Sequence, residues 1–259
     1  MNTVFLMYHE LEAAGRSLRQ QDGGYLRYVN TESDFRRQLQ IIRDAGFTGL
    51  SVSEALDRNW TGKAVAMTFD DGNETDLTVA APLLRDFGYN ATFYVVAGIV
   101  GRRGCLSEAQ IVELVQTGFE IGCHSMNHRY LPDLSDDELK VEIVQAKTRL
   151  EGVIGRSVDH FSCPGGRWSA RVALACREAG YRSMATSHTS VNTAAADRFA
   201  LARIAIRRGT RPRDFDRWIR GEGLRTHKAK ESLFAAAKRL LGPTTYEKLR
   251  LRLLDKRDN

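Results

Sequence analysis

An apolar run at residues 64–69 ends in two adjacent aspartates and a glycine, Asp70, Asp71 and Gly72. Such a run predicts a buried strand, and Gly72 allows the backbone to turn sharply just past its end. The two carboxylates would then lie at the carboxyl edge of a sheet, where α/β proteins commonly place their functional groups. Neighbouring strand side chains point in opposite directions, so we expect different roles for them, one holding a metal and the other handling a proton. A solvated turn is the alternative interpretation.

A second polar cluster follows another predicted strand, at residues 119–123. His124 emerges at the end of that strand, and His128 comes four residues later. Two imidazoles at this spacing can converge on one ion, and an aspartate from a neighbouring strand completes an Asp-His-His set that leaves room for water. Ordinary, partly exposed histidines are the alternative, but two of only six histidines share this strand end.

These two stretches carry a resemblance to a known family. Residues 68–72, followed by residues 124–128, resemble the first two motifs of the polysaccharide deacetylases, also called NodB-homology or carbohydrate esterase family 4 enzymes. Both motifs are complete and in the family's order, and the likeness covers about residues 3–209. The resemblance implies that Asp70 is the general base and that a divalent metal is held by the set Asp71, His124 and His128. Zinc is the expected ion, with cobalt, nickel or manganese as alternatives.

The family's third motif departs from the pattern here. It usually has arginine, any residue, proline and then an aromatic residue, whereas this chain has Ser162 in place of the arginine and Gly165 in place of the aromatic. Arg167 or Arg203 could supply the missing charge. Arg203 lies in an apolar run, where a buried arginine needs an acidic partner such as Asp70. An edge strand with Arg203 facing solvent is the alternative, and the backbone amide of Gly165 could still donate to an oxyanion.

The family's last motif, a leucine-rich strand that ends in a general-acid histidine, is absent near the carboxyl end. His227 lies in a polar stretch, which is the wrong setting. Residues 4–10 instead resemble the first strand of a branch in which the acid motif is moved to the amino terminus, as in deacetylases of biofilm poly-N-acetylglucosamine. His9 is therefore the candidate acid, and a structural histidine that caps the strand is the alternative.

The length of 259 residues fits one α/β domain plus a small appendage. Strand and helix patterns alternate, which predicts a parallel sheet. About seven strands favour the distorted (β/α)7 barrel of the resembled family, with residues 1–223 as the NodB-like domain. No glycine-rich nucleotide motif follows any strand, so no nucleotide cofactor is expected. The expected helices cover residues 33–45, 76–87, 107–115, 135–154, 170–179 and 214–220.

Two polar segments flank this pattern. Residues 10–31 predict a long loop that could cover a sugar site, with Tyr25 or Tyr28 stacking on a ring. Residues 224–259 form the appendage, a basic extension with two amphipathic helices separated by Gly242 and Pro243. Packing on the barrel is the simpler interpretation of these helices, and peripheral contact with anionic membrane lipid is the alternative. The net charge of +6 is spread widely and without a nucleic-acid motif, so no nucleic acid is expected as a partner.

Other features bear on location. The first ten residues are too short an apolar run for a signal segment, and no stretch approaches the roughly 18 apolar residues of a membrane span. Four cysteines form no Cys-x-x-Cys pair and are expected to remain thiols. The sequence therefore predicts a cytoplasmic protein, with an intracellular amino-sugar saccharide, lipid-linked or free, as its substrate at the inner membrane face.

Together, these features and the resemblance predict a metal-dependent hydrolase that removes N-acetyl groups from an amino-sugar saccharide or polysaccharide precursor. In that mechanism Asp70 takes a proton from water, Gly165 helps to hold the oxyanion and His9 protonates the leaving amine. Two alternatives stay open. The same scaffold could hydrolyse another amide or an O-acetyl ester, or the chain could be a catalytically silent sugar-binding member.

Overall fold

The computed structural model describes residues 2–58 and 62–224 of the 259. Strand β5 (Ala64–Asp71) is buried along its whole length, as its apolar run predicted. It pairs in parallel with β1 (Asn2–Tyr8) on one edge and, end to end on the other edge, with β4 (Thr48–Leu50) and β6 (Thr92–Val95). Strands covered on both faces are typical of parallel sheets, so β5 lies at the centre of the core.

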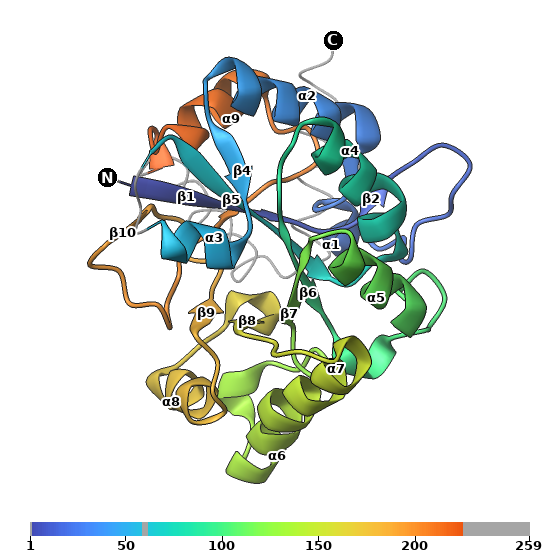
Figure 1. Cartoon of the computed structure of the whole chain (residues 1–259), viewed down its shortest axis with the longest axis vertical. Coiled ribbons are helices and arrows are strands. Elements are labelled where there is room, and N and C mark those ends of the chain that lie inside the picture. The colour runs from blue at the N-terminus through green and yellow to red at the C-terminus, as the bar shows by residue number, and fades with distance from the viewer. Residues whose placement is uncertain (1, 59–61, 225–259) are drawn as a thin grey trace. The chain divides into compact units, whose positions relative to one another are not determined.

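The sheet curls back on itself (Figure 1). Beyond β6 it continues through the parallel strands β7 (Glu120–Cys123), β8 (His160–Ser162) and β9 (Ser183–Ala185). A bridge then joins Ala185 to Leu201, and β11 (Ile204–Ala205) pairs in parallel with β1. The expected α/β fold with a distorted barrel is therefore confirmed. A short antiparallel strand, β10 (Asn192–Thr193), pairs with the first residues of β1.

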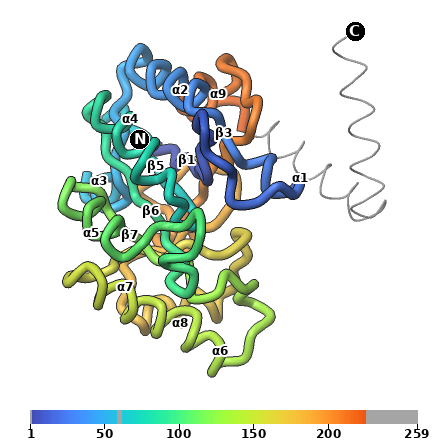
Figure 2. The backbone as a smooth tube through the Cα atoms, turned by 90° about the vertical axis from the view of Figure 1, so that its right-hand side faces the viewer, coloured from blue at the N-terminus to red at the C-terminus, as the bar shows by residue number. Residues whose placement is uncertain are grey.

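Helices lie outside the curled sheet (Figure 1). They are α2 (Glu32–Asp44), α3 (Val52–Asp57), α4 (Ala81–Asp86), α5 (Glu108–Gln116), α6 (Asp136–Lys140), α7 (Ala146–Ile154), α8 (Ala170–Glu178) and α9 (Pro212–Ile219). Two π-helical turns, η1 (Asp76–Ala80) and η4 (Val141–Gln145), lead into α4 and α7. The first and last helices of this set, α2 and α9, pack side by side (Figure 2).

Helix starts follow the sequence signals closely. Ser107 caps α5: its hydroxyl accepts from the Gln110 N–H, and the Gln110 side chain accepts from the Ser107 N–H. The same reciprocal pair joins Ser135 and Glu138 at α6. Each box satisfies two backbone donors that a helix end otherwise leaves without partners. The helices expected from residues 107 and 135 therefore begin at capping boxes.

The polar segment 10–31 differs from a plain loop. It contains the parallel pair β2 (Leu11–Glu12) and β3 (Asn30–Thr31), with the short helix α1 (Gly23–Leu26) between them. None of these short elements was expected from the sequence, and neither was β4, because their two to four residues contain no apolar run that sets them apart. They depend on neighbours from elsewhere in the chain.

Several other predictions concern residues outside the barrel site. The four cysteines are buried and free, as predicted. Residues 225–259, which hold the predicted basic helices, lie outside the described part of the chain, so the domain boundary at residue 223 and the membrane contact stay predictions. Within residues 2–58 and 62–224, no helix has both the length and the apolarity that crossing a bilayer requires.

Candidate active site

The carboxyl ends of the central strands gather the predicted functional residues. Asp71 at the end of β5 pairs with Val95 of β6, which in turn pairs with Cys123 at the end of β7. His124 follows directly. A cavity of about 470 Å³ opens here. Its lining includes six of the candidate residues, His9, Asp70, Asp71, His124, His128 and Gly165, but neither Arg167 nor Arg203.

Asp71, His124 and His128 form a compact group. Each offers one ligand atom, and these atoms lie within 4.8 Å of one another. Asp71 Oδ1 is 3.6 Å from His124 Nε2 and 3.4 Å from His128 Nε2. His124 is buried, whereas the His128 side chain is 45% exposed. The predicted ligand set is thus brought together at the mouth of the cavity.

The protonation of His124 fits a metal ligand. Its Nδ1 lies 2.8 Å from the Ser162 carbonyl oxygen, which can only accept, so Nδ1 carries the proton and Nε2 presents a lone pair. Burial, only partly opposed by Asp70, lowers the pKa of His124 to about 4, so the ring is neutral at neutral pH. A lone pair therefore faces the Asp71 carboxylate. Two acceptors at this separation are stabilised by a cation between them, and the donor set of one carboxylate and two imidazoles suits zinc.

Backbone strain is concentrated at this group. Among the described residues, the non-glycine positions with positive φ are Asp71 (φ 85°), Ser125 (φ 67°) and His128 (φ 57°). Such conformations persist only where neighbours hold them, and they cluster at functional sites. Here Ser125 Oγ accepts from the His128 N–H at 2.9 Å. The buried Glu142 carboxylate accepts from the backbone N–H groups of Met126 and Asn127. These contacts fix the turn that carries His128.

Arg203 is completely buried and forms an ion pair with Asp70. Its Nη1 and Nη2 donate to Asp70 Oδ1 and Oδ2 at 2.7 and 2.8 Å. The three remaining N–H groups donate to Thr186 O, Thr68 Oγ1 and Ser162 Oγ. All five guanidinium donors therefore have acceptors. The solvent-facing alternative for Arg203 is wrong.

Asp70 is ionised as a result. Burial by itself would raise its pKa, but the charge and hydrogen bonds of Arg203, together with His124, hold the pKa well below its usual range. Ser162, which stands in the place of the motif arginine, contacts both partners: it accepts from Arg203 at 2.8 Å and donates to Asp70 at 3.3 Å. A small side chain at position 162 leaves room for an arginine that arrives from the segment at β11.

Arg167, the other candidate for that charge, lies elsewhere. Its guanidinium stacks over the ring of Tyr130 at 4.1 Å, and its side chain is 59% exposed. Tyr130 lines the cavity and is itself half exposed. Gly165 has a φ of +60°, and a Cβ added there would lie 2.7 Å from Tyr130 Cε1. Because Gly165 has no side chain, the ring of Tyr130, which comes from a different loop, fits beside it.

His9 reaches the cavity from the end of β1. Its ring packs against Tyr28, with centroids 5.0 Å apart. Its Nδ1 is buried and lacks a hydrogen-bond partner within the described chain. Burial lowers the pKa of His9, while Asp71 and Asp70 oppose that shift. A histidine in this place can meet a ligand in the cavity, and its role as acid stays a prediction.

Arg19 is a site residue that the sequence did not indicate. It comes from the irregular part of segment 10–31, and its Nη2 donates to Asp71 Oδ2 at 2.7 Å. Glu10 holds this part of the chain: it accepts from the Arg19 backbone N–H at 3.1 Å and from the Tyr25 hydroxyl at 2.6 Å. Tyr25 therefore has its hydroxyl engaged within the protein while its ring lines the cavity.

Only one of the missed residues left a signal in the sequence. Glu142 lies on the buried face of its helix, between the buried Leu139 and Ala146. A glutamate at an apolar helical position needs a polar partner, which could have marked it. Arg19 and Tyr130 lie in irregular segments without periodicity. Their positions depend on how the loops fold over the strand ends.

The comparisons with known proteins agree with this geometry. A family model described as polysaccharide deacetylase matches residues 57–184, which include Asp70, Asp71, His124 and His128. The chain belongs to the polysaccharide deacetylase family. His9 and Arg203 lie outside the matched span of this deacetylase, so their places in its site rest on the geometry alone.

Relatives span different shares of the chain. The peptidoglycan-N-acetylglucosamine deacetylase of Bacillus cereus is 33% identical over 123 residues, which are 47% of this chain and 55% of that enzyme. YxkH of Bacillus subtilis, which bears the family's name, is 26% identical over 219 residues, 83% of this chain and 75% of YxkH. The alignment with the enzyme named for a substrate thus spans little more than half of that enzyme.

Solved structures have a similar fold over most of the described part of the chain. PplD, a Streptococcus pyogenes deacetylase in complex with acetate, gives a TM-score of 0.72 at 26% identity over 83% of this chain and 96% of that one. A polysaccharide deacetylase of Bacillus cereus gives a TM-score of 0.75 at 23% identity over 85% and 69%. The curled α/β sheet is therefore the fold of this family.

Proposed function

We propose that this deacetylase hydrolyses the N-acetyl group of an amino sugar within a saccharide, with a divalent metal as cofactor. One observation supports the proposal above all. The ionised, buried Asp70 lies beside the Asp71, His124 and His128 group in the lining of one cavity. A base next to a three-ligand metal group is an arrangement that can hydrolyse an unreactive amide.

The ligand residues define what a metal would do here. Asp71, His124 and His128 would hold it, and a bound divalent ion lowers the pKa of water and polarises a carbonyl oxygen. Asp70 lies next to this group but outside it, because Arg203 binds both of its oxygens. Asp70 therefore keeps its charge and its orientation, and it accepts the proton of the attacking water.

The remaining wall residues act on the other atoms of the amide. The backbone N–H of Gly165 donates to the oxyanion that develops when water attacks the acetyl carbon. His9 protonates the nitrogen of the leaving amine. Because burial lowers the pKa of His9, its protonated form is a stronger acid than an ordinary imidazolium. The half-exposed ring of Tyr130, held between Arg167 and Gly165, offers a flat apolar surface for a sugar ring.

The names of two relatives support an N-acetylated amino sugar as the substrate class. The Bacillus cereus relative is named for peptidoglycan N-acetylglucosamine, and a relative from Azorhizobium caulinodans, 29% identical over 126 residues, is named for chitooligosaccharides. An arginine does occupy the position that the family's third motif gives to its arginine, which argues against the alternative of a catalytically silent sugar-binding protein. Arg203 supplies the charge that Ser162 cannot.

Acetate release tests the proposal. The zinc-loaded chain is incubated with N-acetylglucosamine tetramer, with peptidoglycan fragments and with O-acetylated xylan, and acetate and free amine are measured separately. We expect acetate and amine in equal amounts from at least one amino-sugar substrate, and none from the Asp70→Asn variant. Acetate from xylan alone would make the protein an esterase. Sugar binding without any acetate would make it the silent member.

A further inference from the structure

A second cavity adjoins the active site. Its volume is about 350 Å³, and it shares four lining residues with the larger cavity: Arg19, Gln20, Asp71 and His128. Its outer wall carries two adjacent arginines, Arg102 and Arg103, on the turn that follows β6. A ligand group in this cavity would therefore lie directly beside the metal-ligand group.

The arginine-bearing turn is well fixed. The Gly101 N–H donates to Leu106 O, and the Cys105 N–H donates to Arg102 O, each at 2.9 Å. The Leu106 N–H donates to Gly72 O at 2.9 Å, which ties the turn to the end of β5. Hydrogen bonds of this kind hold the backbone of the wall in place before any ligand arrives. The two arginines are thus presented by a preformed support.

The charges in this cavity are unbalanced. Asp71 is its one acidic lining residue, and both of its oxygens are engaged: Oδ2 accepts from Arg19, and Oδ1 faces the two histidines. Arg102 and Arg103 are exposed, and neither side chain has an ion pair or hydrogen bond with another residue of the described chain. Guanidinium groups bind carboxylate and phosphate oxygens in forked pairs, so two unpaired ones facing a cavity attract an anion.

We propose that this cavity is a subsite for an anionic group, a carboxylate or a phosphate, carried on the saccharide next to the amino sugar that loses its acetyl group. The inference rests on the proposed function and narrows it to anionic amino-sugar saccharides. The volume lies near the lower end of ligand cavities, about 300–1,000 Å³, and so suits one substituted sugar unit. Arg102 and Arg103 are specificity residues that bind substrate and take no part in the reaction.

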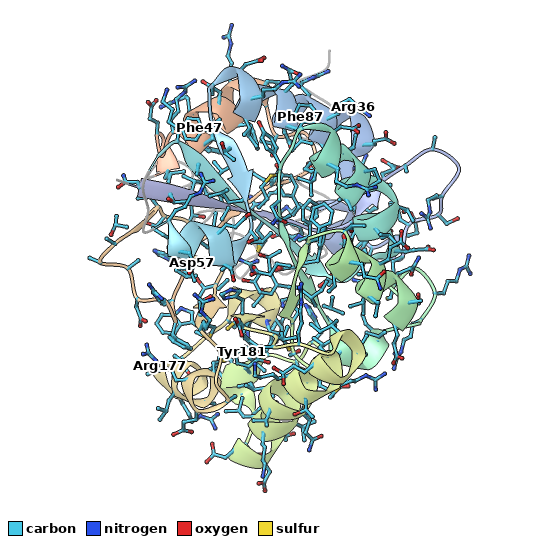
Figure 3. The ribbon with its side chains drawn as sticks, in the orientation of Figure 1. Arg36, Phe47, Asp57, Phe87, Arg177 and Tyr181 are labelled. Atoms are coloured by element: carbon cyan, nitrogen blue, oxygen red, sulfur yellow. The ribbon has the colours of Figure 1, made fainter. Side chains whose placement is uncertain are left out.

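Three matched substrates and two matched variants test the subsite. The substrates are an N-acetylglucosamine trimer, the same trimer with a reducing-end phosphate, and the trimer oxidised to a terminal carboxylate. The test variant is Arg102→Gln with Arg103→Gln. The control is Arg36→Gln with Arg37→Gln, an adjacent exposed pair on α2 that lines neither of the cavities described above. Arg36 lies near the top of the view in Figure 3. Both variants remove two positive charges, so they change the net charge equally.

We expect the unmodified chain to favour at least one anionic trimer over the neutral one by about tenfold or more in kcat/KM, mainly through KM. A preference for both anionic trimers means that any oxyanion is accepted, and a preference for one identifies the group. The Arg102 and Arg103 variant should reduce the ratio to near one. The Arg36 and Arg37 variant should keep the ratio.

An unchanged ratio in the Arg102 and Arg103 variant, an equal loss in both variants, or no preference in the unmodified chain would overturn the subsite. Failure of the proposed function looks different, because no trimer would then yield acetate. In that case calorimetric binding of the same three trimers decides the subsite alone. Tighter binding of an anionic trimer, lost only with Arg102 and Arg103, supports it, and equal binding of all three overturns it.

Discussion

At the scale of single residues, the pair of Asp70 and Arg203 shows that one segment can supply a positive charge that the family's motif places on another. Arg203 comes from the segment at β11 and enters the space beside Ser162, where the family's third motif has its arginine. The sequence left both Arg167 and Arg203 as candidates for the missing positive charge. Only the pairing of β11 with β1 decides between them. Asp71 and His124 were predictable, because Asp71 ends one apolar strand and His124 directly follows another, and such strand ends meet at the same edge of the sheet. His128 was predicted from its spacing to His124.

Replacing Arg203 tests this pair. Arg203→Met leaves the Asp70 charge buried without its partner, so we expect the free energy of unfolding to fall by about 3–5 kcal/mol and turnover to be lost. Chemical denaturation measures the first and acetate release the second. Arg177→Met is the matched control, since it removes an exposed ion pair with Asp197 and should cost about 1 kcal/mol or less. Equal stability of the Arg203 variant and the control would mean that Arg203 is not paired as described.

Asp70 and Asp71 are neighbours with different predicted roles, and conservative variants separate them. Asp70→Asn should retain zinc but lose turnover by on the order of a hundredfold or more, as expected for a lost general base. Asp71→Asn should lose zinc, because an amide oxygen is a poorer ligand than a carboxylate. Elemental analysis of dialysed protein measures the metal. Retention by the Asp71 variant and loss by the Asp70 variant would show that the roles are exchanged.

At the scale of elements, the amino ends of the strands carry a different polar group from the carboxyl ends, where the candidate site lies. The amino ends of β7 and β8 carry Glu120 and His160, whose Oε1 and Nε2 are 3.5 Å apart. Glu120 also accepts from the Thr92 hydroxyl and from the Val52 N–H. Burial disfavours its charge, but hydrogen bonds from His160, Ser53 and Thr92 lower the pKa of Glu120 to about 2. This partly buried group lies at the opposite ends of these strands from Cys123 and Ser162, and we expect it to serve stability.

The Glu120 network predicts a pH dependence. Because the folded pKa lies below the ordinary value of 4.5, ionised Glu120 stabilises the fold fully above about pH 5, and this stabilisation is lost as the pH falls from 4.5 toward 2. Glu120→Gln should therefore lower the free energy of unfolding by on the order of 3 kcal/mol at pH 7 and by much less at pH 3. Glu138→Gln, in an exposed capping box, is the control and should change less at pH 7. A Glu120 effect that is equal at both pH values would contradict the network.

The elements that the sequence revealed are those with a local cause. The helices α5 and α6 begin at capping boxes, and β5 is defined by its own apolar run. The elements that it did not reveal are short: β4 has three residues, and β2 and β3 have two each. Such strands are stabilised by backbone pairing with distant segments rather than by their own pattern. The same reason hid Arg19, which follows β2.

At the scale of the whole molecule, the curled sheet brings residues from both ends of the described chain to the candidate site. His9 comes from the first strand and Arg203 from the segment of the last, while the metal-ligand group comes from the middle strands. The family model covers only the middle part. We therefore expect activity to require the pairing of β1 with β11, which places His9 and Arg203 together.

The central claim is that one metal ion at Asp71, His124 and His128 is required for N-deacetylation. The most direct measurement removes metal with a chelator, adds zinc back in steps, and records bound zinc and acetate release from N-acetylglucosamine tetramer in the same samples. We predict that activity rises in proportion to bound zinc and reaches its maximum at about one ion per chain. His124→Ala and His128→Ala should bind little zinc and release no acetate while remaining folded by circular dichroism. Full acetate release from metal-free protein, or from either histidine variant, would contradict the account.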